Sequence, residues 1–241
     1  MKLRYKVAAV LAIATLVAGT AAANSVLAKP EYMTASTDAA TIKPLAYVGD
    51  TLSGHTLRGI PDGMGAMRNA DGTITLLSVH EVPSYGAIGA LAKAADKGKP
   101  IQGTSITKLT LNKAGDRVLS ASDLVSSWSF YNYNTGQYQA SPVGAAPKTQ
   151  TLGMDNFISR FCSATLVQAG ALSFKDGSTT LGYDGAVFLS GEEDGDSGYG
   201  RGFAFDMDGN GINLPRMGLA SWENLMPNLK PGKNTVVMGN E

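Results

Sequence analysis

The stretch Asn69-Ala70-Asp71-Gly72-Thr73-Ile74-Thr75-Leu76-Leu77-Ser78-Val79 joins an acidic-glycine turn to a short apolar strand. Asp-Gly and Asn-Gly pairs between apolar runs indicate β-hairpins, because these residues tolerate positive φ. Similar short strands are predicted along the rest of the chain, most of them beside turns rich in Gly, Asn and Asp. They cover residues 106–111, 117–119, 172–174, 186–189, 202–205 and 235–238. Together with 29 glycines, this pattern predicts an all-β protein.

The hairpins resemble one another loosely. Repeated four-stranded units of this kind favour a β-propeller, predicted here over residues 46–241. A β-sandwich with large loops gives the same rhythm of strands and turns, so that architecture stays open. Only residues 87–97 have the composition of a helix. Residues 126–151, rich in Ser, Asn, Gly and Tyr, have weak periodicity and are predicted to form a long surface loop.

The propeller is expected to be incomplete, with about three to four blades at roughly 40–50 residues per blade. The strand predicted at residues 235–238 is followed only by Gly239-Asn240-Glu241, which supplies neither a turn nor a returning strand. We therefore expect an open arc with an unpaired last strand and apolar surface exposed on its C-terminal side. On this interpretation the chain is the N-terminal part of a longer domain.

Residues 1–28 are predicted to be a cleavable secretory signal peptide. Lys2, Arg4 and Lys6 precede an apolar run over residues 7–17, and small residues allow cleavage after Ala23 or Ala28. The apolar run is too short to span a bilayer comfortably, although an uncleaved membrane anchor is the alternative. The protein is expected to be secreted or periplasmic by the general secretory route, with no membrane association after cleavage. Residues 29–45 are predicted to be a loose N-terminal segment.

Charge and cysteine content narrow the function classes. The chain has 20 basic and 20 acidic residues, and removal of the three basic residues of the signal leaves 17 against 20. Nothing in this balance suggests a nucleic-acid or anionic-membrane partner. Cys162 is the only cysteine, so an internal disulfide is excluded. It is either a small buried hydrophobic residue or a thiolate that acts as a metal ligand or nucleophile.

Several predicted strands run into acidic residues. Residues 74–79 lead to His80-Glu81, residues 186–189 lead to Glu192-Glu193, and Glu223 lies in Ser221-Trp222-Glu223-Asn224. The strand ends nearest the axis of a propeller converge, and carboxylates gathered there repel one another unless a cation lies between them. Oxygen-rich sites favour hard ions such as calcium. These four glutamates are therefore candidate metal ligands, whereas any one of them alone resembles a solvated strand end.

Residues 206–213 contain a second acidic pattern. Asp206, Asp208 and Asn210 match the start of a calcium loop, but Met217 stands where a bidentate glutamate is required. An EF-hand is excluded, while a plain β-turn and a weak surface calcium site both stay open. A Ser-His-Asp hydrolase site is not visible, because the only histidines are His55 and His80 and there is no nucleophile elbow. Phosphate-binding and dinucleotide-binding glycine motifs are also missing.

Several motifs, in order along the chain, carry a family resemblance. They are Gly59-Ile60-Pro61-Asp62-Gly63, Asn69-Ala70-Asp71-Gly72-Thr73 leading to His80-Glu81, Arg160-Phe161-Cys162-Ser163-Ala164, Gly191-Glu192-Glu193, Ser221-Trp222-Glu223-Asn224 and Thr235-Val236-Val237. Over roughly residues 45–241 this ordered set resembles the PhoX-type alkaline phosphatase superfamily, whose members are secreted β-propellers. These phosphatases hold iron and calcium ions at the propeller axis and hydrolyse phosphate monoesters.

The resemblance implies iron and calcium as cofactors and a small phosphate ester as substrate. Cys162 then matches the iron-bound thiolate, and Glu81, Glu193 and Glu223 match metal-binding carboxylates, with Glu192 beside them. An arginine could hold the phosphate oxygens in a bidentate manner. Arg160 and Arg201 are the nearest arginines in sequence, and Arg160 is the catalytic candidate together with Cys162. The expected activity is that of a secreted, metal-dependent phosphomonoesterase.

Three departures from the family pattern keep other functions open. Residues 165–190 replace a Trp-rich stretch, the export signal lacks paired arginines, and the chain stops at Glu241 where relatives continue through further blades. The alternatives are a non-catalytic calcium-binding surface propeller and a calcium-dependent lactonase or esterase on the same scaffold. Cys162 discriminates between them, because only the iron-dependent phosphatase needs a thiolate beside the carboxylates.

Overall fold

The computed structural model of the chain describes residues 33–82, 103–140, 158–193 and 200–241. The chain divides into two compact units, Met1–Ile42 and Lys43–Glu241. In the first unit, residues 33–42 form no strand and contain a turn in which the Ala39 amide donates to Thr37 Oγ1 at 3.1 Å. The predicted signal peptide and the predicted helix at residues 87–97 lie outside the described residues.

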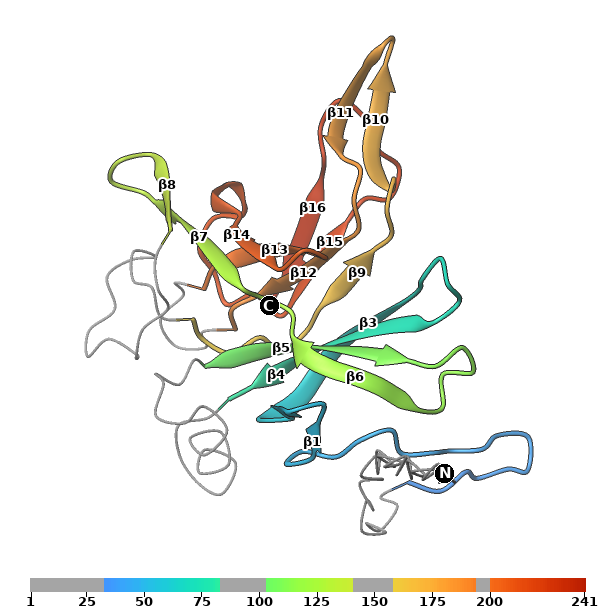
Figure 1. Cartoon of the computed structure of the whole chain (residues 1–241). Helices are drawn as coiled ribbons and strands as arrows, with labels where there is room; N and C mark the ends of the chain where they lie inside the picture. The colour runs from blue at the N-terminus through green and yellow to red at the C-terminus, as the bar shows by residue number, and fades with distance from the viewer. Residues whose placement is uncertain (1–32, 83–102, 141–157, 194–199) are drawn as a thin grey trace, which may run out of the picture. The chain divides into compact units, whose positions relative to one another are not determined.

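The second unit contains a four-stranded antiparallel sheet (Figure 1). Its strands, in chain order and in sheet order, are β3 (Ile60–Arg68), β4 (Ile74–Glu81), β5 (Thr104–Leu111) and β6 (Val118–Asp123). The strands predicted at residues 74–79 and 106–111 are confirmed, and the one predicted at residues 117–119 extends to Asp123. The β3–β4 turn closes as expected, because Gly72 has a φ of 86° and the Asp71 carboxylate accepts the Thr73 amide at 2.9 Å.

A six-stranded sheet has the order β8-β7-β14-β13-β12-β9. Its strands are β7 (Ser127–Asn132), β8 (Gln137–Ala140), β9 (Thr165–Val167), β12 (Val187–Gly191), β13 (Gly202–Asp206) and β14 (Asn210–Asn213). Neighbouring strands are antiparallel except β14 and β7, which run parallel with Gly211 opposite Trp128. The strands predicted at residues 186–189 and 202–205 are confirmed.

The prediction of a surface loop over residues 126–151 is wrong for β7 and β8. The Phe130 side chain of β7 is only 2% exposed. The Trp128 ring packs edge-on against Phe203 and Phe205, with ring centroids 5.6 and 5.5 Å apart. Burial of these aromatic rings stabilises β7 as a strand, although the polar composition of the segment predicts a loop. Residues 141–151 lie outside the described part of the chain.

The remaining described strands of the second unit form three two-stranded antiparallel sheets. They pair β1 (Thr51–Leu52) with β2 (His55–Thr56), β10 (Leu172–Asp176) with β11 (Thr179–Tyr183), and β15 (Asn224–Pro227) with β16 (Val237–Asn240). One short 3-10 helix, η1 (Pro215–Met217), is the only helical turn among the described residues. The protein is therefore all-β, as predicted, with several open sheets, and the described strands do not close into a propeller. Within the same ranges, no helix has the length and hydrophobicity needed to cross a membrane.

The expectation of an unpaired last strand is wrong. β16 pairs with β15, with Met238 opposite Met226, so its partner precedes it in the chain instead of returning after it. Apolar side chains are nevertheless exposed on this hairpin and its connection, as expected: Met226 is 46% exposed, Leu229 61%, Val236 51% and Met238 60%.

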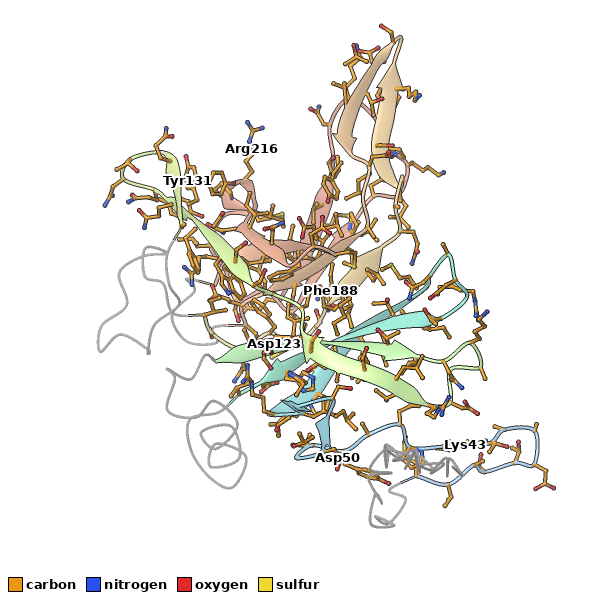
Figure 2. All side chains as sticks on the ribbon, in the orientation of Figure 1. Lys43, Asp50, Asp123, Tyr131, Phe188 and Arg216 are labelled. Atoms are coloured by element: carbon orange, nitrogen blue, oxygen red, sulfur yellow. The ribbon has the colours of Figure 1, made fainter. Side chains whose placement is uncertain are left out.

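The main core gathers side chains from both large sheets. Its buried members include Leu77 and Val79 of β4, Ile106 of β5, Phe161, Phe188 of β12, and Phe203 and Phe205 of β13. Phe188 is fully buried near the middle of the second unit (Figure 2). The sheets approach closely at β3 and β9, because a Cβ atom added to Gly65 would overlap the Leu166 side chain. Strand alternation then places Glu81 on the same face of β4 as Leu77 and Val79.

The opposite face of β4 carries a buried polar pair. His80 is 3% exposed, and neither of its ring nitrogens has a hydrogen-bond partner. Ser105 lies directly opposite His80 on β5, and its hydroxyl is also buried without a partner. Burial lowers the pKa of His80 to about 4, with smaller contributions from His55 and Arg58. The imidazole is therefore neutral at neutral pH.

Gly65→Ala is expected to lower the free energy of unfolding by about 1–3 kcal/mol, because the added methyl group overlaps Leu166 where the two sheets meet. Gly232→Ala is the matched control, since a Cβ atom at that position meets nothing within 4 Å. Urea denaturation of both variants measures the difference. Equal stabilities would contradict the close approach of β3 and β9.

Stability is expected to fall as the pH drops from about 7 to about 5. The folded-state pKa of His80 lies below its ordinary value of 6.5, so the unfolded chain binds more protons in this range. His80 should account for about 2 kcal/mol of the loss. His80→Leu removes the titrating group, and urea titrations of chelator-treated protein at both pH values compare it with the unmodified chain. An equally steep loss in the variant would show that His80 is not responsible.

Candidate metal centre

Cys162 lies at the centre of an acidic group. Its thiol donates to Glu81 Oε1 at 3.2 Å, and Glu81 is the last residue of β4. Asp62 completes a triad, because one ligand atom from each of Asp62, Glu81 and Cys162 lies within 4.8 Å of the other two. Cys162 is buried, Glu81 is partly exposed and Asp62 is exposed, so the triad runs from the protein interior to solvent. The structure thus places the lone cysteine beside carboxylates.

A β-bulge directs Asp62 toward the triad. The β3–β4 register pairs Pro61 with His80 and Met64 with Ser78, so Asp62 and Gly63 together stand opposite one residue of β4. Gly63 lets the bulge touch the segment that follows Cys162, because a Cβ atom there would overlap the backbone of Ser163 and the next residue. Bulges often re-aim side chains near functional sites, and this one brings a carboxylate that sequence reasoning did not assign.

An antiparallel bridge between Phe161 and Glu192 sets which side chains face the triad. Directly beside the bridge, the Glu193 amide donates to the Arg160 carbonyl at 2.9 Å, so Arg160 and Glu193 stand opposite each other. Their side chains form a two-contact ion pair, with Nη2–Oε1 at 3.0 Å and Nε–Oε2 at 3.1 Å. Alternation along both segments puts this pair on the face of Cys162, which interacts with both side chains.

Glu192 takes the opposite direction, into the core. Its Oε2 accepts from Arg201 Nε at 2.7 Å and from the Arg201 amide at 2.9 Å. Its Oε1 accepts from Arg201 Nη2 at 3.0 Å and from the Ser159 amide at 2.8 Å. Both side chains of the ion pair are 3% exposed. The structure therefore does not bring Glu192 into the acidic group, and its contacts give it a structural role in place of the expected metal ligation.

Glu223 joins the group from the segment before β15. Its amide donates to the Asn240 carbonyl at 2.8 Å, and its carbonyl accepts the Ser163 hydroxyl. Its side chain is close enough to Glu193 and Asp62 for their charges to raise its pKa, after burial as the main cause. Of the three carboxylates expected to converge, Glu81 and Glu193 contact Cys162. Glu223 is near enough for electrostatic interaction with the group, but among the described residues only Asp62, Glu81 and Cys162 have ligand atoms within 4.8 Å of one another.

Counting only the part of the chain that the structure describes, the group holds more negative charge than its partners neutralise. Burial, followed by the charges of Glu81 and Glu193, raises the pKa of Asp62. The hydrogen bond from Arg160 lowers the pKa of Glu193, as does a hydrogen bond with Cys162. Arg160 is therefore the counter-charge for one carboxylate and leaves the others in mutual repulsion. A bound cation would relieve this repulsion.

The Cys162 thiol is a proton donor in this arrangement. Burial, reinforced by hydrogen bonds with Glu193 and Glu81, raises its pKa well above the ordinary value. A cation among these side chains would favour the thiolate and release the proton, because the thiolate is the metal-binding form. The donor set of one sulfur and several carboxylate oxygens fits calcium at the oxygens and a softer ion such as iron at the sulfur.

The Asp206 turn is explained by its own hydrogen bonds. Asp206 Oδ1 accepts the amides of Asp208 and Asn210 at 3.0 and 2.8 Å, and Oδ2 accepts Asn210 Nδ2 at 2.8 Å. Both carboxylate oxygens are used to close the turn between β13 and β14. Of the two readings of this stretch, the contacts favour the β-turn.

Comparisons with known proteins return no relative: no family model matches the chain, and neither curated proteins nor solved structures match it at a significant level. The function therefore has to be argued from the site and from the ordered motifs.

The two neighbouring glutamates are expected to respond differently to neutralisation. Glu192→Gln should lower the free energy of unfolding by about 3–5 kcal/mol, because it removes the charge of a carboxylate that is buried against the Arg201 guanidinium. Glu193→Gln should cost less than about 1 kcal/mol, since the Arg160 side chain is 46% exposed. Urea denaturation of metal-free protein tests both variants. A larger loss for Glu193→Gln than for Glu192→Gln would reverse the assignment.

Proposed function

We propose that this protein is a metal-dependent phosphomonoesterase similar to the PhoX-type alkaline phosphatases, with its metal centre at Cys162, Glu81, Glu193 and Glu223. The observation that carries the proposal is convergence. Glu81 and Glu193, from motifs far apart in the chain, both contact the Cys162 thiol, and Glu223 lies near enough to interact with their charges. The resemblance implies metal binding for these same residues. Asp62, which lies in the first of those motifs, adds a further carboxylate.

Different side chains of the site would bind the cations and the phosphate. Glu81, Glu193, Glu223 and Asp62 offer oxygen ligands for calcium, and Cys162 offers sulfur for iron after loss of its proton. Bound cations would supply charge stabilisation for the phosphoryl group during its transfer to water. Arg160 is the group available to orient the phosphate, because its guanidinium is on the site face and partly exposed.

The proposal includes a propeller architecture and export of the protein to the periplasm or the exterior. The β3–β6 sheet has the four antiparallel strands of a propeller blade. It supports the proposal that the chain forms an incomplete propeller of about three to four blades. The apolar residues exposed on the β15–β16 hairpin support it as well. The predicted signal peptide would deliver the protein to the periplasm or the exterior, where a phosphate ester is the substrate.

Metal analysis of the purified protein, combined with a p-nitrophenyl phosphate assay, tests the proposal. We expect calcium and iron together with turnover that a chelator abolishes. Cys162→Ser should lose iron, and Glu81→Gln should lower the calcium affinity by about tenfold or more because it removes a charged ligand. Asp208→Asn, in the exposed turn, is the control and should change neither.

The alternative functions give different results in the same assay. Calcium without iron and without turnover would favour a non-catalytic calcium-binding protein. Hydrolysis of lactones or carboxylic esters, with none of phosphate esters, would favour an esterase. Unchanged iron content in Cys162→Ser would refute the role of the thiolate as a ligand.

A further inference from the structure

Arg160 and Glu193 form an ion pair in which each side chain blocks a possible ligand of the other. Glu193 occupies the guanidinium fork that could bind phosphate, and Arg160 binds a carboxylate that could bind a cation. The two parallel contacts between guanidinium and carboxylate, at 3.0 and 3.1 Å, use the arginine fork that binds phosphate oxygens equally well. The Glu193 carboxylate also lies among the groups assigned above to cation binding. The side chains are 46% and 26% exposed, so the pair can separate without disturbing the core.

Arg201 does not offer a second phosphate-binding arginine. Its guanidinium is 3% exposed and its fork is filled by Glu192. It also lies over the rings of Phe130 and Phe203, with 5.1 and 5.5 Å to their centroids. Of the two arginines that flank the site in sequence, Arg160 alone is placed to meet a ligand from solvent.

We propose that Glu193 is an internal substitute for the phosphate anion, and that a cation bound at Glu193 releases Arg160 to hold the phosphate. The inference rests on the proposed function, which supplies the cation. Without a cation, Glu193 fills the guanidinium fork and competes with phosphate. With a cation, the carboxylate gains a stronger partner and the fork becomes available. The protein therefore favours cation binding before phosphate binding, and the two ligands strengthen each other's affinity.

The decisive experiment uses metal-free protein and inorganic phosphate. Calorimetric titration should show that Glu193→Gln binds phosphate at least about threefold more tightly than the unmodified protein, as expected for loss of a partly exposed ion pair. Glu223→Gln is the matched control, because it removes one negative charge from the same acidic group and leaves the Arg160–Glu193 pair intact. Its gain should be smaller. The double variant Arg160→Gln/Glu193→Gln should lose the gain.

Three results would overturn the inference. An equal gain in phosphate affinity for Glu193→Gln and Glu223→Gln would assign the effect to net charge. A gain that persists in the double variant, or no measurable phosphate binding by Glu193→Gln, would also contradict it. Because no metal and no turnover enter this measurement, its outcome is separate from that of the phosphatase assay. A protein without phosphatase activity could still satisfy it, and an active phosphatase could fail it.

A second arm measures the coupling directly. Saturating calcium should raise phosphate affinity, and saturating phosphate should raise calcium affinity by the same factor. The factor should shrink in Arg160→Gln, since the released arginine carries part of it. An undiminished factor in this variant would mean that direct contact between cation and phosphate accounts for the coupling, and the inference would be wrong.

Discussion

Alternation of side chains across the Phe161–Glu192 bridge separates the core of this protein from its candidate site. Phe161 and Glu192 face inward, where the aromatic core and the Arg201 guanidinium receive them. Arg160, Cys162 and Glu193, beside the bridge, lie on the opposite face and form part of the acidic group. A one-residue slip would exchange the two sets, burying Glu193 among aromatic rings and exposing Glu192. The Arg201–Glu192 ion pair resists such a slip, because a misplaced register would leave a charge buried without its partner.

The fold was predictable where strands and turns leave a local signal. The strand at residues 74–79 follows a turn that needs positive φ at Gly72, and both features are found. β7 was not predictable, because its stability comes from Trp128 and Phe130 packing on strands some 80 residues later in the chain. β3 was missed for a related reason, since Gly63 and Gly65 serve close contacts with other segments and weaken its apolar pattern. Tertiary packing decides such strands, and composition does not record it.

The sequence predicted which residues form the candidate site better than it predicted how their side chains are oriented. Strand ends and motif resemblance pointed to Glu81, Glu193 and Cys162, which lie in contact, and to Glu223, which lies close enough for its charge to interact with the others. The selection of Glu192 ignored the alternation of adjacent residues, which cannot both face one site in an extended segment. The sequence gives no sign that Asp62 belongs to the site, because only the bulge between Pro61 and Met64 turns its side chain toward Glu81. A bulge leaves little trace in a single sequence beyond the glycine that permits it.

The parallel contact between β7 and β14 has a consequence for the order of folding. The β3–β6 sheet joins strands that are neighbours in the chain, so its loops close at low entropic cost and it can form early. β7 can pair early with β8, but its other edge needs a strand far downstream, since Ser127 reaches Asn210 across 83 residues. Until β13 assembles, Trp128 and Phe130 lack the rings of that strand against which they pack. We therefore expect the docking of β7 on strands far downstream to be slow, and we expect the partly folded chain to expose aromatic rings that favour aggregation.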